Sequence, residues 1–246
     1  MNFSTIINGL TVNAHYSEKS VNEIFIPFLK KLTRLQKEKG ERVIAFLAAP
    51  PGTGKSTLCA FLEDLSKKTD CVSPICIIGM DGFHKKQEYL LSHTAVIDES
   101  EVPMVKIKGN PITFDTEKLR EKLAEVKKGG KVLWPLYDRL LHDPVEDAVE
   151  VNGDIVLIEG NYLLLNTDGW KHLRDFADYT VYIKASTEDL RRRLVDRKSA
   201  SGTPRDEAEH FVETSDLVNA VTCNTESTEA DLTLIMTRDG EYRIYK

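Results

Sequence analysis

The sequence predicts an α/β fold with a doubly wound, mainly parallel sheet that carries helices on both faces. A continuous apolar run at 43–48 is typical of a strand buried on both sides of a parallel sheet. A loop rich in glycine and proline follows directly, and a helical apolar pattern comes after it. Farther along, segments with strand character alternate with helical segments, which is the chain order of a doubly wound sheet.

The remaining elements follow from the spacing of apolar residues. Strands are expected at 75–79, 132–136, 154–158, 180–184 and 232–236. Helices are expected after the glycine-rich loop, with Leu58, Phe61, Leu62 and Leu65 on one face, and at 115–128, 187–199 and 206 to about 219. Because no repeat, low-complexity tract or Gly/Ser linker divides these elements, we expect one domain over residues 1–246.

Residues 1–40 predict a β-hairpin and a helix ahead of this core. The dipeptide Asn8-Gly9 separates two β-prone runs, and it is typical of a tight hairpin turn because both positions take φ > 0. A helical pattern spans 21–39, and Gly40 suits its C-terminus. This N-terminal unit either packs on the sheet edge or forms the contact of a homodimer, and the sequence leaves both open.

Composition excludes several classes of protein. The 246 residues contain 33 Lys+Arg and 39 Asp+Glu, so the net charge is −6, which argues against a general nucleic-acid binder and against attraction to anionic membranes. The apolar stretch at 43–51 is far shorter than the roughly 20 residues of a membrane-spanning helix. The N-terminus has no signal-peptide pattern, and the four cysteines include no CxxC pair. We therefore expect a cytoplasmic protein with free thiols.

The segment Ala49–Thr57 matches the phosphate-binding pattern G-x-x-x-x-G-K-[ST], with alanine in the first position. Its glycines let backbone N–H groups turn toward phosphate oxygens, and the helix that follows presents its positive N-terminal end. Lys55 can neutralise the β- and γ-phosphates, and the Ser56 hydroxyl can bind Mg²⁺. The residues expected to bind nucleotide here are Pro51, Gly52, Thr53, Gly54, Lys55, Ser56 and Thr57.

Two acidic residues at strand ends indicate what happens to the phosphate. Asp81 follows the strand at 75–79, and the carboxyl edge of a parallel sheet faces the ligand crevice, so Asp81 can accept a proton from an attacking hydroxyl. Glu159 ends the strand at 154–158 and is expected to bind Mg²⁺ directly or through water. No Asn-Lys dipeptide occurs, which weighs against a GTPase that reads guanine with Asn-Lys-x-Asp.

An arginine-rich segment lies at 186–198. Arg193 and Arg197 are four residues apart and share one helix face, so they could close over the phosphates from a lid at 187–215. The alternative is a solvated helix face with i,i+4 ion pairs, Glu188–Arg192 and Asp189–Arg193. The lid interpretation is favoured because this is the densest positive cluster in an acidic chain.

Together these segments resemble the phosphoribulokinase/uridine kinase/pantothenate kinase family of P-loop small-molecule kinases. The resemblance runs from about Arg42 to Ala220 and looks closest to bacterial fructose-transport-associated or nucleoside kinase-like proteins. The segments that carry it, besides the phosphate loop and the arginine-rich segment, are Met80–Lys85, Lys108–Asp115, Trp134–Arg139 and Ile158–Leu164.

The resemblance implies that ATP and Mg²⁺ serve the transfer of phosphate to an alcohol, with Asp81 and Lys55 as catalytic residues. It places the acceptor near His84, Lys108, Tyr137, Asp138, Arg139 and Asn161. Directly after Asp81 this sequence reads Gly-Phe-His, which departs from the uridine kinase pattern. Uridine is therefore a less favoured acceptor.

The main hypothesis is therefore a kinase that phosphorylates a hydroxyl of a small polar metabolite such as a sugar, a nucleoside or a pantothenate-like alcohol. The alternative is a regulatory or chaperone-like P-loop ATPase that needs a protein partner. Asp81 and the segment Tyr137–Arg139 favour the kinase, because a nucleotide sensor would not need them.

Overall fold

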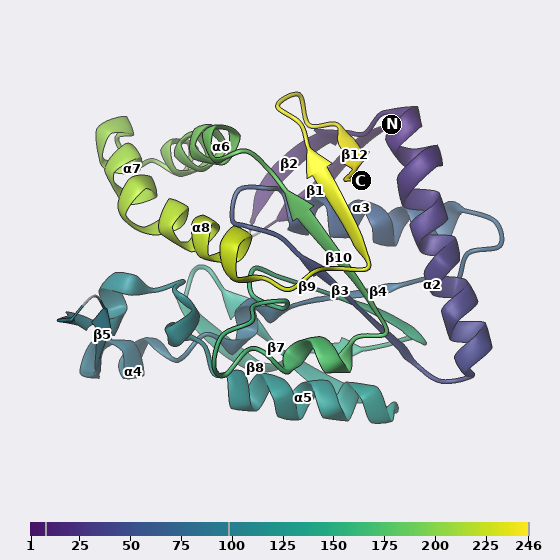
Figure 1. Ribbon diagram of the computed structural model, residues 1–246, viewed down its shortest axis with the longest axis horizontal. Helices are drawn as coiled ribbons and strands as arrows, with labels where there is room; N and C mark the ends of the chain where they lie inside the picture. Colours follow the sequence, from purple (N-terminus) through teal and green to yellow (C-terminus); the bar gives the residue numbers. More distant parts are fainter. Residues whose placement is uncertain (8, 98, 246) are drawn as a thin grey trace.

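The computed structural model describes residues 1–246 except 8, 98 and 246 (Figure 1). The strands are β1 (Asn2–Ile7), β2 (Leu10–His15), β3 (Val43–Ala48), β4 (Cys76–Gly79), β5 (Thr94–Ile97), β6 (Ser100–Pro103), β7 (Val132–Asp138), β8 (Asp143–Val151), β9 (Ile155–Gly160), β10 (Tyr179–Lys184), β11 (Leu232–Met236) and β12 (Tyr242–Ile244). The α-helices are α1 (Glu18–Ser20), α2 (Ile26–Lys39), α3 (Lys55–Lys68), α4 (Gln87–Ser92), α5 (Thr116–Lys128), α6 (Thr187–Ala200), α7 (Arg205–Phe211) and α8 (Leu217–Glu226). Short π-helical turns lie at Val21–Phe25 and Val212–Asp216, and 3-10 turns at Met80–Phe83, Met104–Ile107, Pro111–Thr113 and Leu173–Phe176.

The central sheet has the strand order β12-β11-β10-β3-β9-β4. Its strands run parallel except β12, which pairs with β11 antiparallel. All six residues of β3 are buried, which explains why its sequence is apolar without alternation. The predicted mainly parallel sheet is confirmed, and the phosphate loop and Glu159 lie together at the carboxyl ends of β3 and β9.

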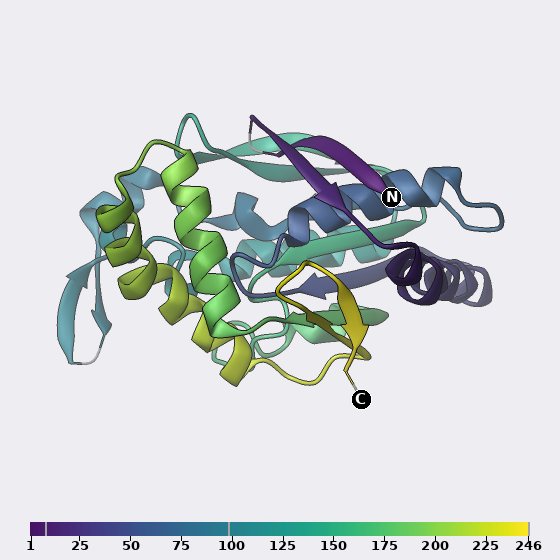
Figure 2. The ribbon, with the colours of Figure 1, turned by 90° about the horizontal axis from the view of Figure 1, so that it is seen from above.

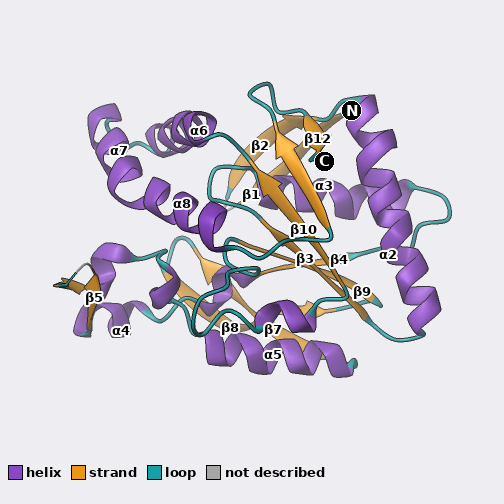
Figure 3. Ribbon diagram, in the orientation of Figure 1, coloured by secondary structure: helices purple, strands orange, loops and turns teal. Residues whose placement is uncertain are grey.

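Helices cover both faces of this sheet, as Figures 1 and 3 show. The helices α2 and α3 pack on one face, where Leu29 and Phe61 belong to a common core with β3 residues such as Val43. The helix α5 packs on the other face through Leu119 and Leu123. The helix predicted at 115–128 is α5, and Asp115 caps its start by accepting a hydrogen bond from the Lys118 amide (3.0 Å).

The predicted N-terminal hairpin is formed by β1 and β2, and its turn residue Asn8 lies outside the described residues. The hairpin packs on α3, with the ring centroids of Phe3 and Phe61 5.4 Å apart. This contact is with the helix α3, whereas packing on the sheet edge was one of the two expected alternatives. The following helical run starts earlier than expected, at Glu18, and Gly40 ends it with φ 68°.

The strand expected at 132–136 does not join the central sheet. As β7 it pairs antiparallel with β8, which the sequence did not reveal, and the two form a separate hairpin. This β7–β8 hairpin docks on the turn after β4, where the Trp134 Nε1–H donates to the Gly79 carbonyl (2.8 Å). A Cβ at Gly82 would lie 2.2 Å from the Pro135 carbonyl oxygen, so glycine is needed for this close approach.

The helices α6, α7 and α8 form a separate layer beside the sheet, visible at the left of Figure 2. They share a small apolar cluster that includes Leu190, Leu194 and Leu217. The helix expected at 206–219 is α7, a π-helical turn and α8 in sequence, and it continues to Glu226. The four cysteines are free, and none of the helices described is both long and apolar enough to span a bilayer.

Candidate functional site

The phosphate loop lies between β3 and α3 with the geometry that its glycines predict. Gly52 and Gly54 have φ of 87° and 79°, in the left-handed region that favours glycine. Thr53 is buried, and its Oγ1 donates to the Pro50 carbonyl (2.9 Å). Pro51 is also buried, while Lys55, Ser56 and Thr57 form the first turn of α3. The loop therefore surrounds the N-terminal end of a helix, which attracts anions.

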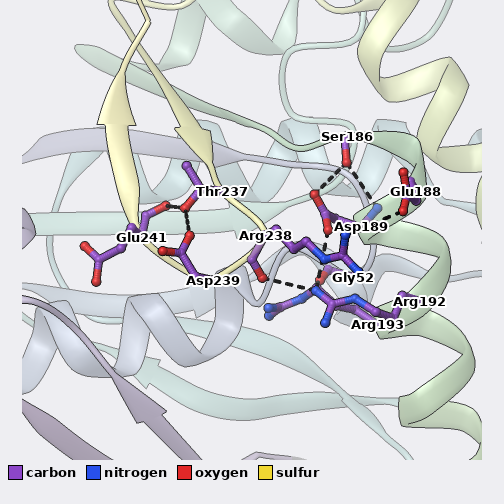
Figure 4. Close-up of polar contacts among 10 residues, drawn as sticks. All are labelled: Gly52, Ser186, Glu188, Asp189, Arg192, Arg193, Thr237, Arg238, Asp239 and Glu241. Carbon is purple, nitrogen blue, oxygen red and sulfur yellow. Dashed lines mark hydrogen bonds and ion pairs between the residues drawn. The ribbon is translucent and has the colours of Figure 1, made fainter.

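Arg193 is fixed to this loop by a backbone contact, which Figure 4 shows. Its Nε–H donates to the Gly52 carbonyl oxygen (2.7 Å), and its Nη2 lies 3.1 Å from where a Cβ at Gly54 would be. A Cβ at Gly52 would in turn lie 2.9 Å from Leu194 Cγ. The helix α6 is thus packed against the phosphate loop, with Arg193 at the expected binding surface.

The two i,i+4 ion pairs of the alternative interpretation do not form among the described residues of α6, because these side chains have other partners. Arg192 lies 3.5 Å from Asp189, three residues away, and donates to the Arg238 carbonyl (3.1 Å). Glu188 lies 3.9 Å from the Arg238 side chain. Figure 4 shows these contacts between the start of α6 and the turn that joins β11 to β12. A turn far along the chain competes with the i,i+4 pairs that helix spacing predicts.

Arg197 has a different environment from Arg193. Its Nη2 lies 3.9 Å from Asp216 Oδ2, and its side chain remains 61% exposed. Asp216 belongs to the π-helical turn before α8, and burial raises the pKa of its carboxyl, while Arg197 and Lys198 oppose the change. The sequence did not single out Asp216, because it sits within a predicted helix and carries no motif.

Ser56 and Glu159 form the end of the site that is suited to a metal ion. The Ser56 hydroxyl donates to Glu159 Oε1 (2.8 Å), and Glu159 Oε2 is buried without a hydrogen-bond partner among the described residues. Burial raises the pKa of Glu159, and the Lys55 ammonium opposes that change. A buried carboxylate oxygen with unused acceptor capacity beside a hydroxyl fits Mg²⁺, which commonly takes one or two carboxylates plus phosphate oxygens.

Asp81 lies in the 3-10 turn directly after β4, slightly beyond the strand end that the sequence predicts. Its Oδ2 lies 3.3 Å from Arg139 Nη2. Burial acts to raise the pKa of Asp81, but His84 and the cations Lys55, Arg139 and Arg197 outweigh it, so the pKa is lowered. Asp81 is therefore ionised at neutral pH and able to accept a hydrogen bond or a proton.

His84 and Tyr137 lie beside Asp81. His84 Nδ1 is 2.8 Å from the Asp81 carbonyl oxygen, and since a carbonyl only accepts, Nδ1 carries the hydrogen. The His84 ring lies 3.9 Å from Phe114 and 5.0 Å from Tyr137 between centroids. Burial lowers the pKa of His84, although Asp81 opposes this, which favours the neutral imidazole.

The Tyr137 ring is flanked by two cations. The Lys108 ammonium lies 5.1 Å from its centroid, and the Arg139 guanidinium lies 5.5 Å away. Lys108 also donates to Gln87 Oε1 (2.6 Å) and to the His142 carbonyl (2.7 Å). Lys108 thereby joins α4, the end of the β7–β8 hairpin and Tyr137 in one network.

Asp138 and Asn161 differ from these residues in their hydrogen bonding. Asp138 Oδ1 accepts hydrogen bonds from the amides of Leu140 (2.7 Å) and Leu141 (3.0 Å), so it caps the β7–β8 turn. Asn161 Oδ1 is buried and has no hydrogen-bond partner in the described part of the chain, which leaves an acceptor next to the strand that carries Glu159.

Gly82 lines two cavities. One of about 290 Å³ is lined by Ser56, Asp81, Tyr137, Arg139 and Glu159 together with apolar residues. The other, of about 550 Å³, is lined by His84, Phe114 and residues at the start of α5. Lys108 and Asn161 line neither of them.

A phosphate loop, an acidic residue at the end of the adjacent strand and a second carboxylate facing a cavity define the class of P-loop kinases that act on small molecules. Comparisons with known proteins agree with this class. The family described as "Phosphoribulokinase / Uridine kinase family" matches residues 43–229. The chain belongs to this family, whose members carry out ATP-dependent phosphorylation of small metabolites.

Individual relatives cover more of the chain. A protein of Escherichia coli (strain K12) named YggC is 39% identical over 243 residues, which is 98% of each chain. A pantothenate kinase of Myxococcus xanthus (strain DK1622) is 28% identical over 240 residues, covering 86% of this chain and 73% of that one. The crystal structure of a "putative fructose transport system kinase" from Silicibacter sp. TM1040 matches with a TM-score of 0.72 at 30% identity, covering 83% of this chain and 98% of that chain.

Proposed function

We propose that this protein transfers the γ-phosphoryl group of ATP to a hydroxyl group of a small metabolite, with Asp81 as the base. The single observation that carries the proposal is that Asp81 lines the same cavity as Ser56 and Glu159. A hydroxyl bound there lies between a carboxylate with a lowered pKa and the phosphate end of the site. Such a position allows an in-line attack with the proton accepted locally.

In the proposed step, the acceptor oxygen forms a bond to the γ-phosphorus and gives its proton to the Asp81 carboxylate. The bond between the γ-phosphorus and the β,γ-bridging oxygen breaks, and ADP leaves. Lys55 and Arg193 lie at the phosphate loop and offset negative charge on the phosphate oxygens. Ser56 and Glu159 would hold Mg²⁺, which neutralises charge on the β- and γ-phosphates.

The remaining expected residues have supporting roles in this proposal. Tyr137 and Arg139 line the cavity and bind the acceptor. His84 and Lys108 position Tyr137 from outside the cavity, through the ring contact and the cation–π contact described above. Asn161 is assigned to acceptor orientation from the end of β9, and Arg197 approaches the phosphates from the lid at 187–215. Residues 1–246 act as one kinase domain. The ion pair between Asp81 and Arg139 supports this arrangement, because it keeps the carboxylate ionised next to a cation that can bind a substrate oxygen.

The test is a panel of acceptors with MgATP, including sugars such as fructose, nucleosides such as uridine, and pantothenate. Formation of a phosphorylated product, detected by mass spectrometry, together with matching ADP release supports the proposal. Asp81→Asn should lower kcat by about 10²-fold or more while MgATP still binds, because the substitution removes the proton acceptor. The matched control is Asp64→Asn on α3, whose carboxylate pairs with Lys68 outside the site.

Two results would count against this function. If no acceptor raises ADP release above the hydrolysis seen without acceptor, the regulatory ATPase becomes the better explanation. If Asp81→Asn keeps nearly normal kcat with a good acceptor, the kinase stands but Asp81 is not its base.

A further inference from the structure

The cavity of about 290 Å³ beside Asp81 has one wall that comes from the N-terminal hairpin. Ile6 and Ile7 of β1 line it, as do Leu136 of β7 and Val149 of β8. Its volume is at the lower end of the range for small-molecule pockets, which starts near 300 Å³. The residues 1–42, which include this wall, lie outside the family match at 43–229.

The lining of this cavity combines polar and apolar side chains. Asp81, Arg139 and Glu159 line it where the proposed function places the reacting groups, and Ser56, Glu63 and Tyr137 add further polar groups. The rest of the lining is mostly hydrocarbon, from β1, β4, β7, β8 and Ala60 of α3. A ligand that fills the cavity would therefore present a hydroxyl to Asp81 and an apolar surface to the hydrocarbon part of the lining.

Two of the apolar wall residues are unusually exposed. Ile6 is 71% exposed and Leu136 is 52% exposed, although they belong to different hairpins that line the same cavity. Large apolar side chains that face a shared hollow remain in contact with water until something covers them, at a cost proportional to their apolar area. The hairpin itself is held in place, since Phe3 packs edge-on against Phe61 of the P-loop helix.

We propose that this cavity binds the apolar part of the acceptor, so that the substrate is an amphipathic alcohol with one reacting hydroxyl and a compact hydrocarbon portion. This inference rests on the proposed function and names the substrate class for that site. The hydrocarbon portion lies between the N-terminal hairpin and the β7–β8 hairpin, and the hydroxyl lies at Asp81. The N-terminal hairpin thus determines specificity in addition to packing on α3.

Physical chemistry favours this class over a sugar hydroxylated on all sides. Hydroxyl groups that displace water from the side chains of Ile6, Leu136 and Val149 gain no hydrogen-bond partner from those side chains. A hydrocarbon portion gains free energy with each methylene that it buries. Selectivity between the two kinds of acceptor should therefore depend on the side chains of the apolar wall.

The experiment uses the full-length protein with MgATP and a series of vicinal diols from propanediol to octanediol, with glycerol and fructose as polar comparators. We expect kcat/KM to rise by about fourfold per methylene until the cavity is filled. Ile6→Ala should lower kcat/KM for the preferred long diol by about tenfold and for glycerol by less than twofold. The control is Val96→Ala on β5, whose side chain is 70% exposed but far from the cavity lining.

Leu136→Ala provides a second variant, in the part of the lining that β7 contributes, and serves if Ile6→Ala lowers the melting temperature markedly. It should reduce the preference for long diols in the same way. If diol length does not change kcat/KM while polar acceptors are phosphorylated, the inference is overturned and the kinase stands. If long diols are preferred but neither variant alters that preference, the hydrocarbon portion binds elsewhere and the inference is again overturned. If no alcohol in this series or in the wider metabolite panel is phosphorylated, the proposed function fails first.

Discussion

The nucleotide half and the acceptor half of the site are held in place in different ways. The phosphate loop connects two central elements, β3 and α3, and the Gly52 carbonyl fixes it to Arg193 at 2.7 Å. The acceptor half is built on the β7–β8 hairpin, which lies outside the central sheet and is joined to it through Trp134 and the turn at Gly82. Its residues contact one another mainly through side chains, as Asp81 and Arg139 do at 3.3 Å.

This difference shows how one fold can serve several substrates. Phosphate binding needs backbone N–H groups, one lysine and a metal-binding end, and these cannot change without changing the sheet. Acceptor binding depends on side chains of a hairpin that can change while the sheet stays intact. Variants in the nucleotide half should therefore affect every acceptor equally, whereas variants in the acceptor half should change selectivity.

The largest effect is expected from Lys55→Met, which removes the charge at the start of α3. We expect kcat/KM to fall by about 10³-fold with every acceptor, because Lys55 stabilises negative charge that develops on the phosphates. Steady-state ADP release with two unrelated acceptors measures this. The control is Lys68→Met on the same helix, where the side chain is 67% exposed and pairs with Asp64. A loss limited to one acceptor would contradict the division into two halves.

The nucleotide half was largely predictable because its physics is local in sequence. The six buried residues of β3 form an uninterrupted apolar run, and the glycines after it have the positive φ that a phosphate loop requires. Asp115 could be assigned as the start of α5 from its position before an amphipathic pattern, and its contact with the Lys118 amide agrees. Each of these signals lies within a few residues of the feature it predicts.

The acceptor half could be predicted only in part, because its geometry depends on distant contacts. The strand β8 went unnoticed since Pro144 and the positive φ of Asp147 (51°) interrupt its alternation. β7 was expected in the central sheet, but nothing in its own residues says which partner it takes. Arg193 was expected at the phosphates, yet its hydrogen bond to the Gly52 carbonyl, 141 residues away, has no sequence signal.

A smaller effect, about 10²-fold, is expected from Glu159→Gln, together with a higher Mg²⁺ concentration for half-maximal activity. The neutral amide keeps the shape but loses the charge that attracts the cation. The pH profile adds a second measurement. Burial raises the pKa of Glu159, so protonation occurs above the usual range of a glutamate and kcat/KM for MgATP should fall as pH decreases through it.

This fall of kcat/KM at low pH, the acid limb of the profile, should reflect protonation of Glu159. Asp81 should not contribute to it, because its pKa is lowered and it stays ionised throughout that range. Glu159→Gln should remove the limb, while Asp81→Asn should lower the rate and leave the position of the limb in place. The control for the loss of a carboxylate is Glu38→Gln on α2, where Glu38 pairs with Arg34 at the surface. An unchanged limb in Glu159→Gln would show that another group governs Mg²⁺ binding.

Substitution of either lid arginine should change one kinetic constant by about tenfold, and the constant should differ between the two variants. Arg193→Ala removes the hydrogen bond to Gly52, so we expect a higher KM for MgATP and a melting temperature lower by a few degrees, because a partly buried carbonyl loses its donor. Arg197→Ala removes an exposed side chain, so we expect a lower kcat and an unchanged melting temperature. Kinetics and thermal unfolding of both variants measure this contrast, and an identical pattern in the two variants would contradict it.

The smallest effect is expected from Asp138→Ala, which tests where the acceptor half ends. Asp138 was expected to bind the acceptor, but its Oδ1 accepts from the Leu140 and Leu141 amides and so holds the β7–β8 turn. Loss of such a cap should reduce the free energy of unfolding by about 1 kcal/mol and change kcat/KM by less than threefold. Asp138→Asn keeps an accepting oxygen and should restore most of the stability. If Asp138→Ala instead raises the acceptor KM by tenfold or more without loss of stability, the carboxylate leaves the turn to bind substrate, and acceptor recognition extends to the end of the hairpin.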